Sequence, residues 1–268
     1  MSIRVGDVDV HIEGTGPQVL LMIHGWPDTY RVWDAQAAYF SAHYRCVRFT
    51  LPGYDDRTSH QAYSVDQIAR LINQVVDAVS PNQPVVLMIH DWGAVFGYEF
   101  YRQHPNKVAQ MVSLDIGDAL SSAHVKSLKP HQLALVASYQ LSLAVSWHIP
   151  ESVATRITRG FAKVLQHTNP KQAHRGMNYP YFLAWFKRLS QPIKPFSETP
   201  NCPMFFIYAK RKPLMFHSDA WVARLQAVPH HRVLGMPTGH WIMQDQPEQF
   251  NEVVWAWLTQ TQTNSASI

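Results

Sequence analysis

Apolar and polar positions along the first half of the chain predict a series of strands. Residues 5–12 alternate apolar and polar side chains, which is typical of a half-buried strand. Residues 19–23 and 85–89 are continuous apolar runs, as in strands buried on both faces of a parallel sheet. Shorter apolar runs predict two further strands, at residues 44–49 and 108–116.

Segments with helical periodicity lie between these strands. Ser64 is followed three residues later by Gln67, the spacing of a capping box, which predicts a helix beginning there. Its apolar stripe has a period of 3.6 residues and consists of Ile68, Leu71, Ile72, Val75, Val76 and Val79. A second helix is predicted from Gly93 to His104. Alternating strands and helices indicate a mostly parallel α/β sheet flanked by helices.

The pattern changes after Asp118. Residues 119–199 contain apolar helical segments and no convincing strand, and the best helices are predicted at 132–147 and 151–166. The earlier pattern then resumes with strands at 204–208 and 232–235 and helices at 220–228 and 248–258. We therefore expect a sheet-containing core, residues 1–118 and 200–268, with a helical insertion of residues 119–199 that forms a cap.

Composition narrows the class of protein. Hydrophobic residues make up 46% of the 268 residues and charged residues 16%, which suits one compact domain with an insertion. The formal charge of +4 comes from scattered Lys and Arg residues, so no nucleic-acid partner is expected. The chain starts without an apolar targeting segment, and residues 19–23 are too short to span a bilayer. We expect a cytoplasmic protein with no membrane association.

The 15 histidines include no pair with the spacing of a zinc site. No metal and no cofactor are therefore expected.

The strongest chemical signal lies at the end of the second buried run, His90-Asp91-Trp92-Gly93. A buried strand, a tight turn with Gly93 two residues after Asp91, and a following helix form the context of a nucleophile elbow. A carboxylate nucleophile displaces a leaving group at an sp3 carbon and gives an ester that water can cleave. The alternative for Asp91 is a simple helix cap.

Two further segments support the elbow. His24-Gly25-Trp26-Pro27 follows the first buried run, where this kind of fold provides a backbone N–H to an oxyanion hole. Trp92, directly after the nucleophile, would provide another N–H. Thr238-Gly239-His240-Trp241 places one histidine late in the chain, in the order of nucleophile and then base. We expect His240 to activate the water.

These motifs resemble those of the α/β-hydrolase-fold epoxide hydrolases and the related haloalkane dehalogenases, over nearly the whole chain. The resemblance rests on His24-Gly25-Trp26-Pro27, His90-Asp91-Trp92-Gly93 and Gly239-His240. It implies an α/β-hydrolase fold whose helical cap is inserted after the sixth strand, and a hydrolase with an Asp nucleophile that acts on a small apolar molecule. Ile89 departs from the small residue that many relatives have two positions before the nucleophile.

The resemblance implies different side chains in the cap for the two reactions. Epoxide hydrolases use two cap tyrosines as acids in ring opening, and Tyr139 lies in a segment that resembles the one with the first tyrosine. The segment that resembles the one with the second tyrosine has Pro180 at the aligned position. This leaves either Tyr179, which we prefer, or Tyr181 for the second role. Trp26 also suits epoxide hydrolases. Dehalogenases instead bind a halide through N–H donors.

For a dehalogenase, Trp147 or Trp185 would be the candidate halide ligand from the cap. We favour an epoxide hydrolase that gives vicinal diols. Two alternatives stay open: a haloalkane dehalogenase, and a non-catalytic ligand-binding or interaction protein on a hydrolase scaffold.

The acid that orients His240 is not where relatives usually have it. After the strand at 204–208 that position is occupied by Lys212, which cannot orient a histidine and would disfavour the imidazolium if close. Asp115, at the end of the strand at 108–116, is preferred, because some haloalkane dehalogenases have their acid at the matching position. Asp118 and Asp219 are the alternatives.

Overall fold

The computed structural model describes residues 1–55 and 60–265. Within them, strands form one mixed sheet in the order β1-β2-β4-β3-β5-β6-β7-β8. β2 pairs antiparallel with β1 and β4, and all other pairs are parallel. The strands are β1 (Ser2–Val5), β2 (Val8–Glu13), β3 (Val19–Ile23), β4 (Arg45–Phe49), β5 (Val85–His90), β6 (Val108–Leu114), β7 (Met204–Ala209) and β8 (Arg232–Met236).

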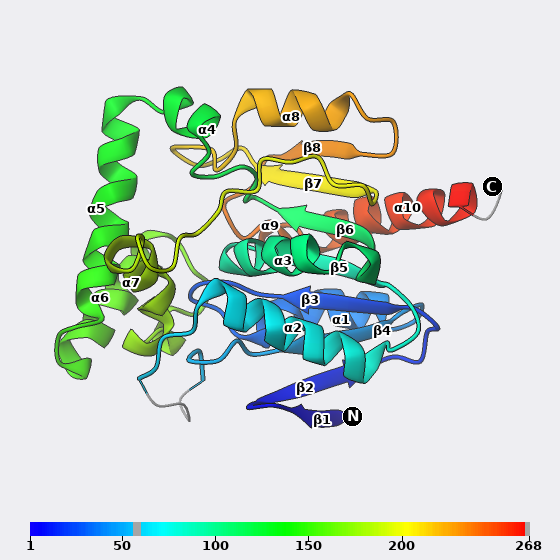
Figure 1. Cartoon of the computed structure of the whole chain (residues 1–268), viewed down its shortest axis with the longest axis horizontal. Helices are drawn as coiled ribbons and strands as arrows, with labels where there is room; N and C mark the ends of the chain where they lie inside the picture. The colour runs from blue at the N-terminus through cyan, green and yellow to red at the C-terminus, as the bar shows by residue number, and fades with distance from the viewer. Residues whose placement is uncertain (56–59, 266–268) are drawn as a thin grey trace.

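The helices lie on both faces of the sheet and at one of its ends (Figure 1). The α-helices are α1 (Asp34–Phe40), α2 (Val65–Val79), α3 (Trp92–Gln103), α4 (Ser122–Ser127), α5 (Pro130–Ser146), α6 (Glu151–Val164), α7 (Tyr179–Phe186), α8 (Asp219–Gln226), α9 (Ile242–Asp245) and α10 (Pro247–Ser265). Short 3-10 helices are η1 (Tyr30–Trp33), η2 (Pro105–Lys107), η3 (Pro170–Gln172) and η4 (Arg175–Asn178).

The two apolar runs behave as fully buried strands. Alternate residues of β3 enter two different clusters: Leu21 and Ile23 pack on one face of the sheet, Leu20 and Met22 on the other. Helices α2, α3 and α8 contribute to the first cluster, and α1, α9 and α10 to the second. The expected fold class, a mostly parallel sheet with helices on both faces, is therefore confirmed.

One predicted strand is wrong. Residues 5–12 do not form a single strand but the inner part of the β1–β2 hairpin, in which Val5 pairs with Val8. Gly6 adopts a positive φ of 53° in the turn, a conformation that glycine reaches at no steric cost. The alternation of apolar and polar residues corresponds to alternating burial in β2, where Val8 and Val10 are buried.

The capping box at Ser64 and Gln67 is present and starts α2 at Val65. Between β6 and β7 the chain forms α4 to α7 without a strand in the described residues, so the insertion follows the sixth strand as expected. Figure 1 shows α5, α6 and α7 grouped beside one end of the sheet, at the left of the view. In the described residues, no helix combines the length and the apolar character that crossing a bilayer requires.

Candidate active site

Asp91 occupies the turn between β5 and α3 in a conformation that few non-glycine residues adopt, with φ of 54° and ψ of −128°. Its side chain makes no capping hydrogen bond to α3, so the simple cap does not explain it. Two glycines make the turn possible. A Cβ on Gly93 would collide with the backbone carbonyls of Ile23 and His24. A Cβ on Gly97 would lie 2.7 Å from Cγ2 of Ile89.

Gly97 therefore accounts for the bulky Ile89. The side chain of Ile89 occupies the space that a Cβ on Gly97, in the second turn of α3, would need. Ile89 itself is fully buried in the cluster that includes α2 and α3. The departure noted in the sequence is thus compensated within the elbow.

The loop after β3 meets the Asp91 carboxylate. The backbone N–H of Trp26 donates to Asp91 Oδ1 over 2.6 Å, and the backbone N–H of Trp92 also hydrogen-bonds this carboxylate. A Cβ on Gly25 would collide with Asp91, so the loop approaches this closely only with glycine there. His24 anchors the loop, because its Nε2 accepts the Leu51 backbone N–H over 2.9 Å. The two N–H groups form an oxyanion-hole geometry.

His240 lies between two carboxylates. Its Nε2 is 3.3 Å from Asp91 Oδ2, and its Nδ1 is 2.5 Å from Asp115 Oδ2. Asp115 is fully buried at the end of β6, has a positive φ of 67°, and accepts the backbone N–H of Ala209 on Oδ1 over 2.9 Å. The structure thus brings Asp91, His240 and Asp115 together.

The other two carboxylates lie elsewhere. Asp118 accepts hydrogen bonds from the Ser218 backbone N–H, the Ser218 hydroxyl and the Ser121 hydroxyl, at 2.6 to 2.7 Å. Ser121 and Ser218 are the N-caps of α4 and α8, so Asp118 ties two helix starts together. Asp219 is exposed in the first turn of α8. Neither has a contact with His240 in the described structure.

The charges in this cluster shift one another's protonation. Burial lowers the pKa of His240, but the hydrogen bonds and charges of Asp115 and Asp91 outweigh it and raise the pKa to about 9. Burial raises the pKa of Asp91, but His240 and the Trp92 N–H bring it below its ordinary value. The pKa of Asp115 lies far below its usual range, since Lys212 and His240 overcome the effect of burial.

Two tyrosines from the helical insertion lie near Asp91. Tyr139 on α5 and Tyr181 on α7 have ring centroids 6.2 Å apart, and the charge of Asp91 acts on both hydroxyls. Burial raises the pKa of Tyr139 to about 12 and that of Tyr181 well above 10, so both stay protonated at neutral pH. The indole N–H of Trp92 donates to the Tyr181 hydroxyl.

Tyr179 points elsewhere, so the sequence-based preference for it over Tyr181 does not fit this geometry. It is fully buried, with its ring against Tyr54, Tyr63 and Trp147. Its ring also lies close to Gly53. Successive residues of a helix are rotated by about 100°, so residues two apart face nearly opposite sides. With Tyr181 turned to Asp91, Tyr179 packs into the insertion.

The two cap tryptophans named as candidate halide ligands, Trp147 and Trp185, have other surroundings. The indole N–H of Trp26 in the oxyanion loop donates to Asn178 Oδ1 over 2.9 Å. Trp147 stacks on Phe182, with ring centroids 5.7 Å apart. Trp185 is 39% exposed, which does not suit a buried halide cradle.

Sequence reasoning missed Asn178. It is fully buried and links the oxyanion loop to the insertion: it accepts from Trp26 and donates to Ser146 Oγ and Thr158 Oγ1, at 2.8 and 2.7 Å. Its position directly before Tyr179 carries no periodic or motif signal in one sequence. Lys212 was noted as a departure, but its contact with Asp115, 2.7 Å from Nζ to Oδ1, was not foreseen.

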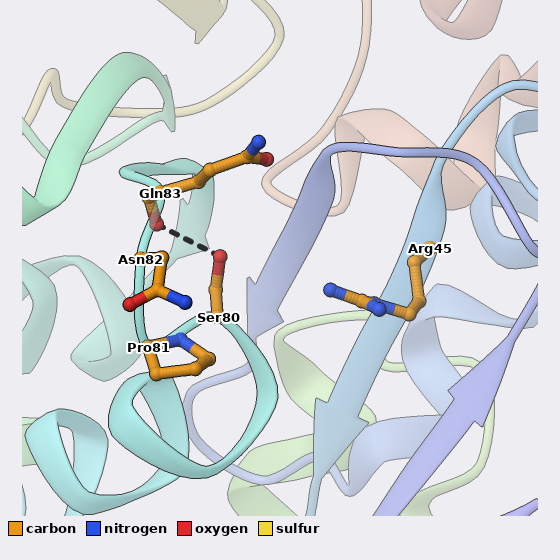
Figure 2. A pocket seen from close by; sticks show the side chains of 5 residues that line it. All are labelled: Arg45, Ser80, Pro81, Asn82 and Gln83. Carbon is orange, nitrogen blue, oxygen red and sulfur yellow. Dashed lines mark hydrogen bonds between the residues drawn. The ribbon is translucent and has the colours of Figure 1, made fainter.

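A surface hollow at the opposite edge of the sheet carries none of these groups. Figure 2 shows its lining, Arg45, Ser80, Pro81, Asn82 and Gln83, with the Ser80 hydroxyl donating to the Gln83 carbonyl. Arg45 begins β4 and Gln83 precedes β5, whereas Asp91 follows the carboxyl end of β5. In the described part of the chain, no three His, Cys, Asp or Glu side chains gather as metal ligands would.

Comparison with known proteins identifies the fold family. A family model described as alpha/beta hydrolase fold matches residues 18–192. The chain is 23% identical to epoxide hydrolase 4 of Mus musculus, over 91% of this chain and 73% of that protein.

Two solved structures have a similar fold over nearly the whole length of this chain. An epoxide hydrolase from Bacillus megaterium superposes with a TM-score of 0.73 and 20% identity, covering 97% of this chain and 100% of that one. A haloalkane dehalogenase variant from Bradyrhizobium elkanii superposes with a TM-score of 0.71 and 16% identity, covering 100% of this chain and 98% of that one.

The chain therefore belongs to the α/β hydrolase fold family. Within that family, the resemblance to epoxide hydrolases that the motifs indicated is confirmed, and the haloalkane dehalogenase structure shares the fold. The matches support a hydrolytic enzyme of this fold.

Proposed function

We propose that this protein is an epoxide hydrolase that converts a small apolar epoxide into a vicinal diol through an ester on Asp91. The observation that carries the proposal is the pair Tyr139 and Tyr181 beside a carboxylate at a nucleophile elbow. Ring opening needs an acid at the oxygen, and two protonated phenols supply it. Similarity to proteins named epoxide hydrolases supports the same reaction. Residues 119–199 act as the cap that provides both tyrosines.

The first step alkylates the enzyme. Asp91 Oδ2 attacks an epoxide carbon and the C–O bond of the ring breaks, while the carboxyl group stays held by the Trp26 N–H on Oδ1 and by the Trp92 N–H. A proton passes from Tyr139 or Tyr181 to the leaving oxygen, which gives a hydroxyl and a tyrosinate. His240 is protonated in the resting site because two carboxylates flank it. It returns a proton to the tyrosinate once Asp91 has become a neutral ester.

The second step cleaves the ester. Neutral His240 takes a proton from water, whose oxygen adds to the Asp91 carboxyl carbon. The oxyanion on Oδ1 is stabilised by the N–H groups of Trp26 and Trp92, and the imidazolium by Asp115. Collapse breaks the bond to the alkyl oxygen, and the proton of the new carboxylic acid passes to that oxygen. The diol leaves, with Asp91 anionic and His240 protonated again.

A single turnover in ¹⁸O-labelled water tests this route. Because water attacks the carboxyl carbon, the label should enter the Asp91 carboxylate first and reach the diol only in a later turnover. Label that enters the diol directly, with none in the enzyme, contradicts the covalent mechanism. Asp91→Ala should abolish turnover, and His240→Gln should accumulate the ester.

A parallel screen separates the alternatives. Styrene-oxide-type epoxides and bromoalkanes are offered to the same preparation, and diol and halide are measured. We expect diol, because the indole N–H groups of Trp26 and Trp92 already have protein acceptors. Halide release with no diol would assign a dehalogenase. Binding of epoxides without turnover of either class would assign a ligand-binding protein on this scaffold.

A further inference from the structure

A lysine is buried at the back of the candidate triad. Lys212 follows β7, and its side chain is 8% exposed. Its Nζ lies 2.7 Å from Asp115 Oδ1 and 4.3 Å from the ring centroid of Phe216. The Phe216 ring also contacts His240, at 5.9 Å between centroids. Lys212, Asp115 and His240 therefore form one continuous charged cluster.

Burying these charged groups costs free energy unless their charges compensate one another. Removing an ammonium from water carries a penalty of several kcal/mol, which an opposite charge at contact distance can offset. Asp115 shares its two oxygens, with His240 on Oδ2 and Lys212 and the Ala209 N–H on Oδ1. The lysine thus faces the carboxylate from the side opposite to the histidine.

Counting charges shows what Lys212 changes. In the resting site, Asp91 and Asp115 are anionic and Lys212 is cationic, so His240 faces a net charge of one negative unit. The ester that the proposed function requires makes Asp91 neutral. Asp115 and Lys212 then cancel, and the histidine faces no net charge, as a general base requires. Without Lys212, one uncompensated carboxylate would still favour the imidazolium.

We propose that Lys212 is a positioning residue that keeps Asp115 anionic and, once the ester has formed, lets His240 release its proton and act as the base. This inference rests on the proposed function. It also gives a role to the lysine at the position after β7 where an acid was expected: the acid follows β6, and the lysine balances its charge.

Other groups also face His240. Asp91 comes from the elbow and Asp115 from the end of β6. His90 on β5 lies 4.5 Å away between ring centroids, and burial lowers its pKa to about 4, so it is neutral. From the segment after β7, Phe216 contacts the ring, and His217, whose pKa burial also lowers to about 4, lies beyond Lys212.

The remaining charges near the cluster come from elsewhere. Asp28 in the oxyanion loop acts on His90, and Asp118 acts on His217. Tyr139 and Tyr181 of the insertion face Asp91 and stay neutral. Among these groups, Lys212 is the one cation that contacts the orienting acid.

The first experiment measures the decay of the preformed ester as a function of pH. Lys212→Met and Lys212→Gln both remove the charge, and Gln retains an N–H donor. In both variants, the acid limb of the profile of ester decay rate against pH should move up by about one pH unit, since an unbalanced carboxylate raises the pKa of His240. Lys212→Arg should restore the wild-type limb. Lys107→Met, which removes a lysine paired with Asp77 far from the site, is the control.

The second experiment does not depend on turnover. In an Asp91→Asn background the nucleophile is neutral, as in the ester, and the His240 ring is titrated by NMR. Adding Lys212→Gln should raise the pKa of His240, whereas adding Lys212→Arg should not. An unchanged pKa with Gln, or equal shifts with Gln and Arg, would overturn the proposed role of the charge.

These readouts separate the two proposals. If the wild-type protein hydrolyses no epoxide, the proposed function fails, while the titration still decides whether Lys212 controls His240. If epoxides are hydrolysed and the acid limb does not move in either uncharged variant, the role of Lys212 fails and the function stands.

Discussion

Asp91 shows how single residues define the reactive centre. Its positive φ lifts the carboxylate off α3, and three glycines, Gly25, Gly93 and Gly97, leave room for the backbone and for Ile89 around it. The donors to the carboxylate, the Trp26 N–H on Oδ1 and the Trp92 N–H, are backbone groups, so their positions depend on the turn and not on a rotamer. In the proposed mechanism, the second oxygen, 3.3 Å from His240 Nε2, is the one that attacks.

Removing one tyrosine hydroxyl should slow ring opening without disturbing the fold. Tyr181→Phe and Tyr139→Phe should each reduce the alkylation rate by about 10²-fold or more, since each donor assists the leaving oxygen. Rapid-quench measurement of ester formation gives this rate. Tyr179→Phe is the matched control, because its hydroxyl faces away from Asp91, and it should alkylate at the wild-type rate. A loss with Tyr179→Phe but not Tyr181→Phe would reverse the assignment.

The orienting acid is tested by a pair of substitutions on one segment. Asp115→Asn should leave alkylation intact but slow ester hydrolysis by roughly two to four orders of magnitude, because the imidazolium loses its carboxylate. Asp118→Asn removes a carboxylate that ties two helix N-caps together, so it should lower the melting temperature and leave the hydrolysis rate unchanged. Slow ester hydrolysis in Asp118→Asn alone would move the role there.

The sequence allowed the elbow, the oxyanion loop and the late histidine to be predicted, because each is a local motif with fixed spacing. The choice of acid was predictable only as a preference, since three aspartates near strand or helix ends look alike in sequence. Asn178 could not be predicted at all. Its partners lie 20, 32 and 152 residues away, and such pairing has no local signature.

At the level of elements, the insertion and the oxyanion loop are joined by few side chains. Asn178, at the start of α7, bonds Trp26 in the loop, Ser146 on α5 and Thr158 on α6. The helix α7 also carries Tyr181, so the same element carries one of the two proposed acids and supports the oxyanion loop. The sequence left α7 unassigned because its residues are almost all apolar or aromatic, which hides helical periodicity.

Replacing Asn178 with leucine should loosen this connection. The indole N–H of Trp26 and the hydroxyls of Ser146 and Thr158 would lose a buried partner, which costs about 2–4 kcal/mol of unfolding free energy. Alkylation should slow as well, because Trp26 and Tyr181 lose their common support. Chemical denaturation and ester-formation kinetics measure the two effects. Asn201→Leu, at an exposed position, is the control, and equal behaviour of both variants would contradict the argument.

At the level of the molecule, the parallel sheet collects the site from distant parts of the chain. The oxyanion loop follows β3, Asp91 follows β5, Asp115 follows β6 and Lys212 follows β7. Parallel strands place all these carboxyl ends at one edge, where ligands bind in open α/β sheets. The alternating pattern was enough to predict the mostly parallel sheet that has this edge. The β1–β2 hairpin was missed because it consists of two short strands in one alternating stretch.

The charged cluster at this edge also makes stability depend on pH. His240 has a folded-state pKa of about 9, above its ordinary value of 6.5. Between these values the folded protein holds a proton that the unfolded chain has released. The resulting stabilisation is fully present below about pH 6.5 and is lost as pH rises through about 9. Each pKa unit corresponds to about 1.4 kcal/mol, so a difference of about 2.5 units limits the loss to about 3–4 kcal/mol.

Comparison with His240→Gln isolates this contribution. Glutamine does not titrate, so the difference in unfolding free energy between wild type and variant should fall steadily from pH 6.5 to 9. Urea denaturation at half-unit pH steps gives both curves, and groups that titrate equally in the two proteins cancel. Curves that run parallel across this range would mean that His240 is already neutral in the resting enzyme. The proton returned to the tyrosinate after ring opening would then have to come from solvent.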